Sequence, residues 1–191
     1  DIFLTADDIF SGYEPEAPDL PEEEELPLIP GEEEAMKMAA EDPSEENILT
    51  LAILRAGHAL SLLNDFKEKG GLPPEKGEFD HPLYTALSSA FSAAELFPDE
   101  PGIIFTIAQI YASFGQNTFT MDLAEEAAER VLELDPSYSE ARLMLGVLQW
   151  TGRSFGLAAE SLERALLEKP ELMDLRAAAI LGSAYLFEND I

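Results

Sequence analysis

The sequence contains no cysteine and only two histidines, His58 and His81, among its 191 residues. Without cysteine the chain can form no disulfide, thiolate metal site or cysteine nucleophile, and two histidines leave little scope for imidazole chemistry. Basic residues are also scarce, since 11 Lys and Arg stand against 39 Asp and Glu and give a net charge of −28. Because binding to phosphate backbones or anionic lipids depends on Lys and Arg, we expect no nucleic acid partner and no membrane insertion.

Long hydrophobic runs and the motifs of known catalytic sites are missing as well. No apolar run approaches the roughly 18 residues that span a bilayer, and the first residues lack the basic start of a signal peptide. We therefore expect a cytoplasmic protein, with the periplasm as the alternative. The sequence has no Gly-rich phosphate loop, no His-Glu-x-x-His motif and no nucleophile elbow. From this we expect no enzyme, no catalytic residue, no metal site and no cofactor.

The first quarter of the chain, residues 1–46, has a composition of its own. It holds 17 Asp and Glu but one basic residue, Lys37, together with six of the 13 prolines. Since proline removes a backbone donor and biases its predecessor toward extended geometry, we expect a mostly extended or disordered tail, with a short helix allowed over Glu33–Glu41. The tail has more apolar residues than a spacer needs. Those expected to dock on a protein surface are Phe3, Ile9, Phe10 and Tyr13.

From Ile48 onward, apolar residues recur every three or four positions, which is typical of amphipathic helices. No alternating strand pattern of useful length occurs. A surface loop is expected over 68–81, where glycines and prolines gather. The predicted helices are 48–67, 82–96, 102–115, 121–134, 138–151, 155–168 and 172–188.

Three of these helices share one spacing of small and apolar residues that a proline closes. The three sets are Ala86, Ala90, Ala93 and Pro98; Ala124, Ala128, Val131 and Pro136; and Ala158, Leu162, Ala165 and Pro170. Leu145-Gly146 precedes the third set, and Leu181-Gly182 followed by Tyr185 lies on the last helix. Small residues at a helix crossing let two backbones approach closely, and proline stops the second helix. The pattern resembles the tetratricopeptide repeat (TPR), a 34-residue pair of helices.

The resemblance implies an all-α fold, a right-handed superhelix of antiparallel helix pairs that follows the extended tail. Residues 47–191 would form this domain, with repeats at about 48–98, 101–136 and 139–170 and a closing helix at 172–188. The first repeat is aligned through Ala56-Gly57 and has a loop longer than the family usually allows. The closing helix begins a fourth repeat without completing it.

In the TPR family, the first helices of successive repeats line a concave groove that receives a peptide or a helix. The resemblance therefore implies an apolar groove, formed by Leu51, Leu54, His58, Phe105, Gln109, Ser113, Leu143, Val147, Trp150 and Arg176. Family members that bind chaperones use Lys, Asn and Arg side chains to bind the C-terminal carboxylate of the chaperone. The corresponding positions here are Leu54, His58, Thr106, Glu140 and Met144, so that we expect no such chaperone partner.

The expected function is a protein–protein interaction scaffold or adaptor that binds a partner's peptide or helix in this groove, with the tail as an internal competitor. Two alternatives remain. One is a self-assembling structural protein, a homo-oligomer formed through the groove or through Tyr185, Leu186 and Phe187, and the other is a secretion-type chaperone that shields an apolar export substrate. Trp150 also has two interpretations, an anchor for the partner or a helix-end residue packed under the next turn. The glutamates on the second helices are typical of solvated faces, with attraction of a basic partner as the alternative.

Overall fold

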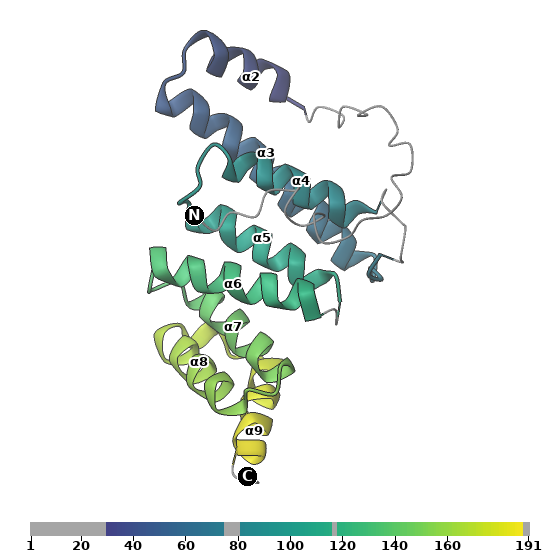
Figure 1. The fold of residues 1–191 in the computed structure, drawn as a ribbon, viewed down its shortest axis with the longest axis vertical. Helices are drawn as coiled ribbons and strands as arrows, with labels where there is room; N and C mark the ends of the chain where they lie inside the picture. Colours follow the sequence, from purple (N-terminus) through teal and green to yellow (C-terminus); the bar gives the residue numbers. More distant parts are fainter. Residues whose placement is uncertain (1–29, 75–80, 116–117, 189–191) are drawn as a thin grey trace.

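The computed structural model describes residues 30–74, 81–115 and 118–188 (Figure 1). The tail residues Phe3, Ile9, Phe10 and Tyr13 lie outside this part of the chain. All regular structure in the described part is helical. In chain order the elements are α2 (Glu32–Glu41), α3 (Glu45–Glu68), α4 (Pro82–Ala94), α5 (Pro101–Ser113), α6 (Thr118–Leu134), α7 (Ser139–Thr151), α8 (Phe155–Glu168), the short 3-10 helix η1 (Pro170–Leu172) and α9 (Leu175–Glu188).

The helices pack as three pairs, α3 with α4, α5 with α6 and α7 with α8. The pairs stack along the long axis of the molecule, with α2 at one end and α9 at the other (Figure 1). The predicted all-α fold of helix pairs with a closing helix is thereby confirmed. No helix in the described ranges is both long enough and apolar enough to cross a bilayer.

The small residues of the repeat motif form the contacts within each pair. All nine of them have no exposed area, namely Ala86, Ala90, Ala93, Ala124, Ala128, Val131, Ala158, Leu162 and Ala165. Their burial lets the second helix of each pair lie close to the first. Prolines and short polar residues set the helix boundaries. Pro82 and Pro101 occupy the first turns of α4 and α5. At the start of α9, Asp174 Oδ1 accepts a hydrogen bond from Ala177 N at 2.7 Å.

The three glycines of the first-helix motif lie in different surroundings. A Cβ atom added to Gly146 would lie 2.7 Å from Leu162 Cγ and 3.1 Å from Leu162 N, so that α7 and α8 are in close contact there. At Gly57 and Gly182 an added Cβ would meet nothing within 4 Å. Only Gly146 therefore serves as the contact point between paired helices that the motif implies.

The first repeat has a different register from the one expected from Ala56-Gly57. In α3 the residues with no exposed area are Ala52, Ala59 and Leu63. The core-facing side of this helix therefore passes through Ala52 and Ala59, and Gly57 lies on the exposed side. In the described part of the chain only α2 precedes α3. It contacts α3 on the side of Arg55, and nothing lies within 4 Å of a Cβ added at Gly57.

Helix α2 lies within the segment expected to be mostly extended, at the place where a short helix was allowed. It packs on α3 through Ala35, which is 4% exposed, and through an ion pair between Arg55 Nε and Glu32 Oε1 at 2.8 Å. Arg55 also donates to the Ser92 carbonyl of α4 at 3.3 Å. In the described part of the chain, helical structure is thus already present from Glu32 onward, ahead of the boundary expected at residue 47.

Candidate binding surface on the first helices

Helix α7 presents an apolar ridge on the side opposite its core contacts. Leu143 and Val147 lie one turn apart, and both are partly exposed. The opposite side of the helix carries Ala141 and Leu145, which are buried. Neither Leu143 nor Val147 belongs to a buried core cluster among the described residues, so both side chains are available to an apolar ligand.

Helix α5 presents a more polar side. Gln109 and Ser113 lie one turn apart and are partly exposed, and Ser113 Oγ donates to the Gln109 carbonyl at 2.8 Å. The Gln109 side-chain amide has no hydrogen bond within the described residues and can therefore bond to a ligand backbone. Phe105 packs against Tyr138 with ring centroids 5.1 Å apart, and the contact connects α5 to the segment that leads into α7.

Three residues expected in the groove lie on α3, and the change of register alters their surroundings. Leu51 is 6% exposed and offers little surface to a partner. His58 Nδ1 forms a hydrogen bond with Ser89 Oγ of α4 at 3.1 Å, and its ring is therefore held between the paired helices. Leu54 is partly exposed. The structure does not bring Leu51 and His58 to an open surface.

The structure instead exposes a line of apolar side chains on α3 that the sequence reasoning missed. Their exposed fractions are 39% for Leu49, 60% for Ile53 and 37% for Leu60. Spacings of four and seven residues place them on one side of the helix. This line lies about a quarter turn around the helix axis from Ala52 and Ala59. It could have been predicted if these two alanines had been identified as the core positions of α3.

Trp150 and Arg176 do not join the ridge on α7. Trp150 packs with Ala158 and Ala159 of α8 and with Leu181 and Ala184 of α9. Its Nε1 atom is buried and has no hydrogen-bond partner in the described part of the chain. This packing supports the second interpretation of Trp150, a helix-end residue covered by the following helices. Arg176 is exposed at the start of α9 and has no ion pair within the described ranges.

Two cations near α7 already have acidic partners, whereas Arg153, just after the end of α7, has no ion pair within the described residues. Lys169 forms an ion pair with Glu140, and this hydrogen bond lowers the pKa of the Glu140 carboxyl and raises the pKa of Lys169. Arg142 is 8% exposed and its Nε lies 3.3 Å from Glu168 Oε2. Arg142 and Lys169 are thus neutralised and add little positive charge for an acidic ligand of the ridge formed by Leu143 and Val147.

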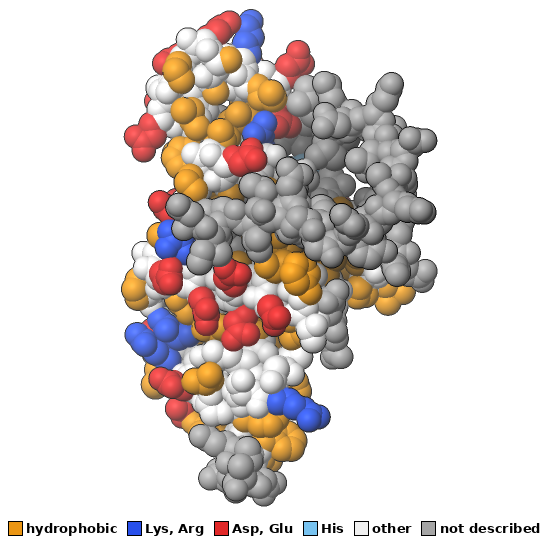
Figure 2. Space-filling model, in the orientation of Figure 1, with side chains coloured by type: hydrophobic (Ala, Val, Ile, Leu, Met, Phe, Trp, Pro, Cys, Tyr) orange, Lys and Arg blue, Asp and Glu red, His pale blue; other side chains and the backbone are white. Residues whose placement is uncertain are grey.

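Acidic side chains gather over α6 (Figure 2). Asp122, Glu125 and Glu129 follow at spacings of three and four residues on this helix. Burial raises the pKa of Glu125, and the nearby charges of Glu129 and Asp122 raise it further. No group of three or more potential metal ligands occurs in the described part of the chain. The carboxylates on α6 therefore repel one another on a solvated face.

This crowding predicts that Glu125→Gln increases stability at neutral pH, by a few tenths of a kcal/mol. A raised pKa means that the folded state binds the proton more tightly than the unfolded state does. The contribution of Glu125 to stability is therefore complete below its unfolded pKa and is lost as the pH rises through its folded pKa. Urea unfolding should show the gain at pH 7 and none at about pH 4. Glu160→Gln, on an exposed residue of α8, is the control, and an equal gain at both pH values would contradict the prediction.

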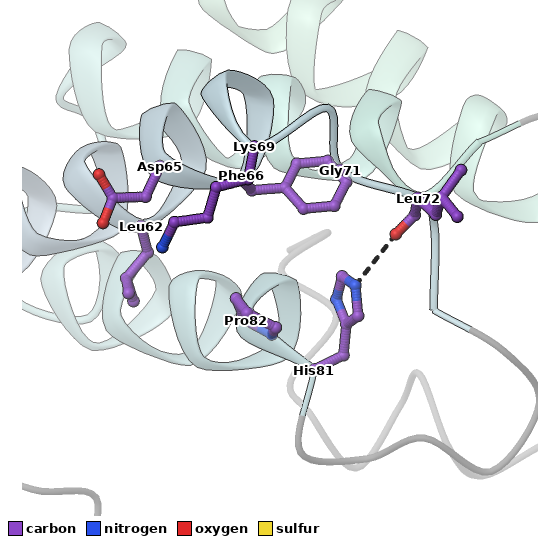
Figure 3. A pocket seen from close by; sticks show the side chains of 8 residues that line it. All are labelled: Leu62, Asp65, Phe66, Lys69, Gly71, Leu72, His81 and Pro82. Carbon is purple, nitrogen blue, oxygen red and sulfur yellow. Dashed lines mark hydrogen bonds between the residues drawn. The ribbon is translucent and has the colours of Figure 1, made fainter.

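A small pocket lies where α3 ends and α4 begins (Figure 3), with a volume of about 170 Å³. His81 Nδ1 accepts a hydrogen bond from Leu83 N at 3.2 Å, and its Nε2 lies 3.1 Å from the Leu72 carbonyl. These bonds require a neutral imidazole with its proton on Nε2, which caps α4 and joins it to the preceding loop. His81 therefore has a structural role. The lining residues are Leu62, Asp65, Phe66, Lys69, Gly71, Leu72, His81 and Pro82.

Solved structures similar to this chain are TPR domains. The second TPR domain of human RPAP3, in complex with the HSP70 peptide SGPTIEEVD, is 17% identical with a TM-score of 0.52, and the match covers 70% of this chain and 98% of that one. The first TPR of Spaghetti (RPAP3), bound to the HSP90 peptide SRMEEVD, is 18% identical with a TM-score of 0.52, covering 69% and 93%. A thermophilic TPR protein of Thermus thermophilus is 20% identical with a TM-score of 0.51, covering 82% and 72%.

No protein-family model matches the sequence. The structural likeness nevertheless agrees with the three helix pairs, with the nine buried motif residues and with the close contact at Gly146. Taken together, the helix pairing, the buried motif and the solved structures show that this chain has the fold of a tetratricopeptide-repeat domain.

Proposed function

We propose that the chain is a protein-interaction module that binds a peptide or helix of a partner protein along α5 and α7. The observation that carries the proposal is the apolar ridge of Leu143 and Val147, which is partly exposed and lies outside the buried core clusters. Gln109 supplies an amide without a partner in the described structure, which would fix the register of the bound chain. Two similar TPR domains were solved with peptides bound, which supports a binding role for this fold.

The ligand that fits this surface is apolar and carries no cluster of acidic residues. Both peptides bound by the similar TPR domains end in Glu-Glu-Val-Asp. In this chain Arg55, Arg142 and Lys169 are already paired with carboxylates. The net charge of −28 adds a long-range repulsion of acidic peptides. We therefore expect SRMEEVD to show no saturable binding to this chain.

The N-terminal tail remains an internal competitor in this proposal. Phe3, Ile9, Phe10 and Tyr13 would occupy the same surface, because a tethered weak ligand has an effective concentration of about 1 mM. A shortened chain that tests this should begin at Pro30 and not after residue 46, since Glu32 pairs with Arg55. Tighter peptide binding by the shortened chain than by the full chain is the expected sign of competition.

The proposal predicts that Leu143→Glu abolishes most of the binding to peptides selected from a displayed library against the full chain. Losing an apolar anchor costs about 2 kcal/mol, which corresponds to a roughly 30-fold weaker Kd in fluorescence polarisation. Leu157→Glu is the matched control, because Leu157 is 57% exposed on α8 and lies outside the proposed surface. Circular dichroism of both variants checks that they are folded. Unchanged affinity of Leu143→Glu for every selected peptide would refute the proposed site.

A further inference from the structure

The free side of α9 has the residue spacing of a helix-packing seam. Leu175, Ala179, Gly182 and Leu186 follow at intervals of four, three and four residues, which places them on one face of the helix. All four are exposed, with 89% for Leu175 and 71% for Leu186. We call these four residues the α9 seam. Figure 2 shows hydrophobic side chains at the α9 end of the molecule.

The opposite face of α9 is already packed. Ala177, Ile180 and Ala184 are 4%, 8% and 0% exposed, and α9 contacts α8. The helix is therefore held in place and formed in advance, and binding through the seam requires no further folding. No helix in the described part of the chain covers the seam side of α9. An apolar seam at this position indicates that another helix covers it.

The α9 seam is complementary to a second copy of itself. In an antiparallel pair related by a twofold axis, Leu175 meets the partner's Leu186, and Ala179 meets the partner's Gly182. Large side chains then fill the two ends, and the small residues let the backbones approach at the centre. An added Cβ at Gly182 would meet nothing within 4 Å in the single chain, which leaves this centre open for a second backbone.

The residues that flank the seam are complementary too. In antiparallel helices each flanking row faces the same row of the partner. Ala178 then faces the ring of the partner's Tyr185, and Arg176 faces the hydroxyl of the partner's Ser183. No two like charges face each other in these rows. Arg176, which has no ion pair in the described ranges, thereby gains a polar contact.

The charge of this end of the molecule permits self-association. Residues 139–191 contain five Lys and Arg and eight Asp and Glu, a net charge of −3, whereas the whole chain carries −28. The described acidic helix α2 lies at the other end of the stack, with the three helix pairs between it and α9 (Figure 1). Screening at physiological salt, with a length of about 8 Å, weakens repulsion between such distant surface charges. We propose that two copies of the chain form a twofold symmetric dimer through their α9 seams. This inference goes beyond peptide binding and does not depend on it.

Sedimentation velocity of the full chain from about 5 to about 300 µM tests the dimer. About three turns of seam on each side make a small interface, for which we expect a Kd of about 10–100 µM. The double variant Leu175→Glu/Leu186→Glu should sediment as a monomer at every concentration, while Leu157→Glu should behave like the wild type. A monomeric wild type, as expected if the seam serves a different partner, would overturn the proposal. Undiminished association of the double variant would overturn it as well.

Cross-linking through introduced cysteines tests the antiparallel arrangement. Because the chain has no native cysteine, a disulfide can form only between the introduced residues. Leu175→Cys mixed with Leu186→Cys should form a disulfide between the two variants, because these residues face each other. Leu175→Cys alone should not, because the two copies of residue 175 lie about 16 Å apart along the helix axis. Efficient cross-linking of Leu175→Cys with itself would indicate a parallel pair and would overturn the proposed geometry.

Discussion

Replacing Trp150 by alanine is expected to lower the free energy of unfolding by about 3–5 kcal/mol. The indole fills the space between α7, α8 and α9, where its neighbours include Ala158, Ala159 and Ala184. Alanines cannot expand to fill the cavity, so most of the cost remains. Because Trp150 is the only tryptophan, urea unfolding should be followed by far-UV circular dichroism and not by fluorescence.

Trp150→Phe is the matched control for this prediction. It keeps an aromatic ring in the same space and removes the buried Nε1 donor that has no partner among the described residues. An unsatisfied buried donor costs about 1–3 kcal/mol, which offsets part of the lost packing. We therefore expect Trp150→Phe to lose less than half as much stability as Trp150→Ala. Near-normal stability of Trp150→Ala together with lost peptide binding would show instead that Trp150 is a ligand anchor.

Gly146→Ala is expected to lower the free energy of unfolding by about 1–2 kcal/mol, although alanine favours helices more than glycine does. The new Cβ would lie 2.7 Å from Leu162 Cγ and 3.1 Å from Leu162 N. A backbone atom cannot be moved aside by a rotamer change, so α8 must shift, and such overpacking costs about 1–3 kcal/mol. The gain in helix propensity of about 1 kcal/mol offsets only part of this cost.

Gly57→Ala is the control, for which we expect a change in the free energy of unfolding of the opposite sign. Gly57 lies in the middle of α3, and an added Cβ meets nothing within 4 Å. The substitution should therefore raise the free energy of unfolding by about 0.5–1 kcal/mol through helix propensity alone. Thermal unfolding of the two variants beside the wild type measures both effects. Equal shifts in the same direction would contradict the close contact of α7 and α8 at Gly146.

The fold was predictable because small residues at fixed spacing leave few alternatives for packing. Ala158, Leu162 and Ala165 predicted the contact of α8 with α7, and the same spacing on α4 and α6 gave the other two pairs. The register of α3 was not predictable from Ala56-Gly57, because no described residue packs against the face of α3 where Gly57 lies. The burial of Ala52 and Ala59 depends on contacts with α4 and α5 that local spacing does not show.

The candidate site was predictable only in part. Gln109, Ser113, Leu143 and Val147 are partly exposed, as a surface on the first helices requires. Trp150 follows Leu143 and Val147 at helical spacing on α7. Its ring nevertheless packs with α8 and α9, because the alanines on those helices leave room for it. Sequence spacing predicts the side of the helix on which a residue's Cβ atom lies. It does not give the direction in which a long side chain turns.

A methyl NMR titration of the full chain with a library-selected peptide tests the central claim most directly. If α5 and α7 form the binding surface, the methyl signals of Leu143 and Val147 should shift in proportion to the bound fraction. Those of Leu157 and Leu167, which are exposed on α8, should stay in place. The largest shifts at methyl groups far from α5 and α7, with Leu143 and Val147 unmoved, would contradict the account.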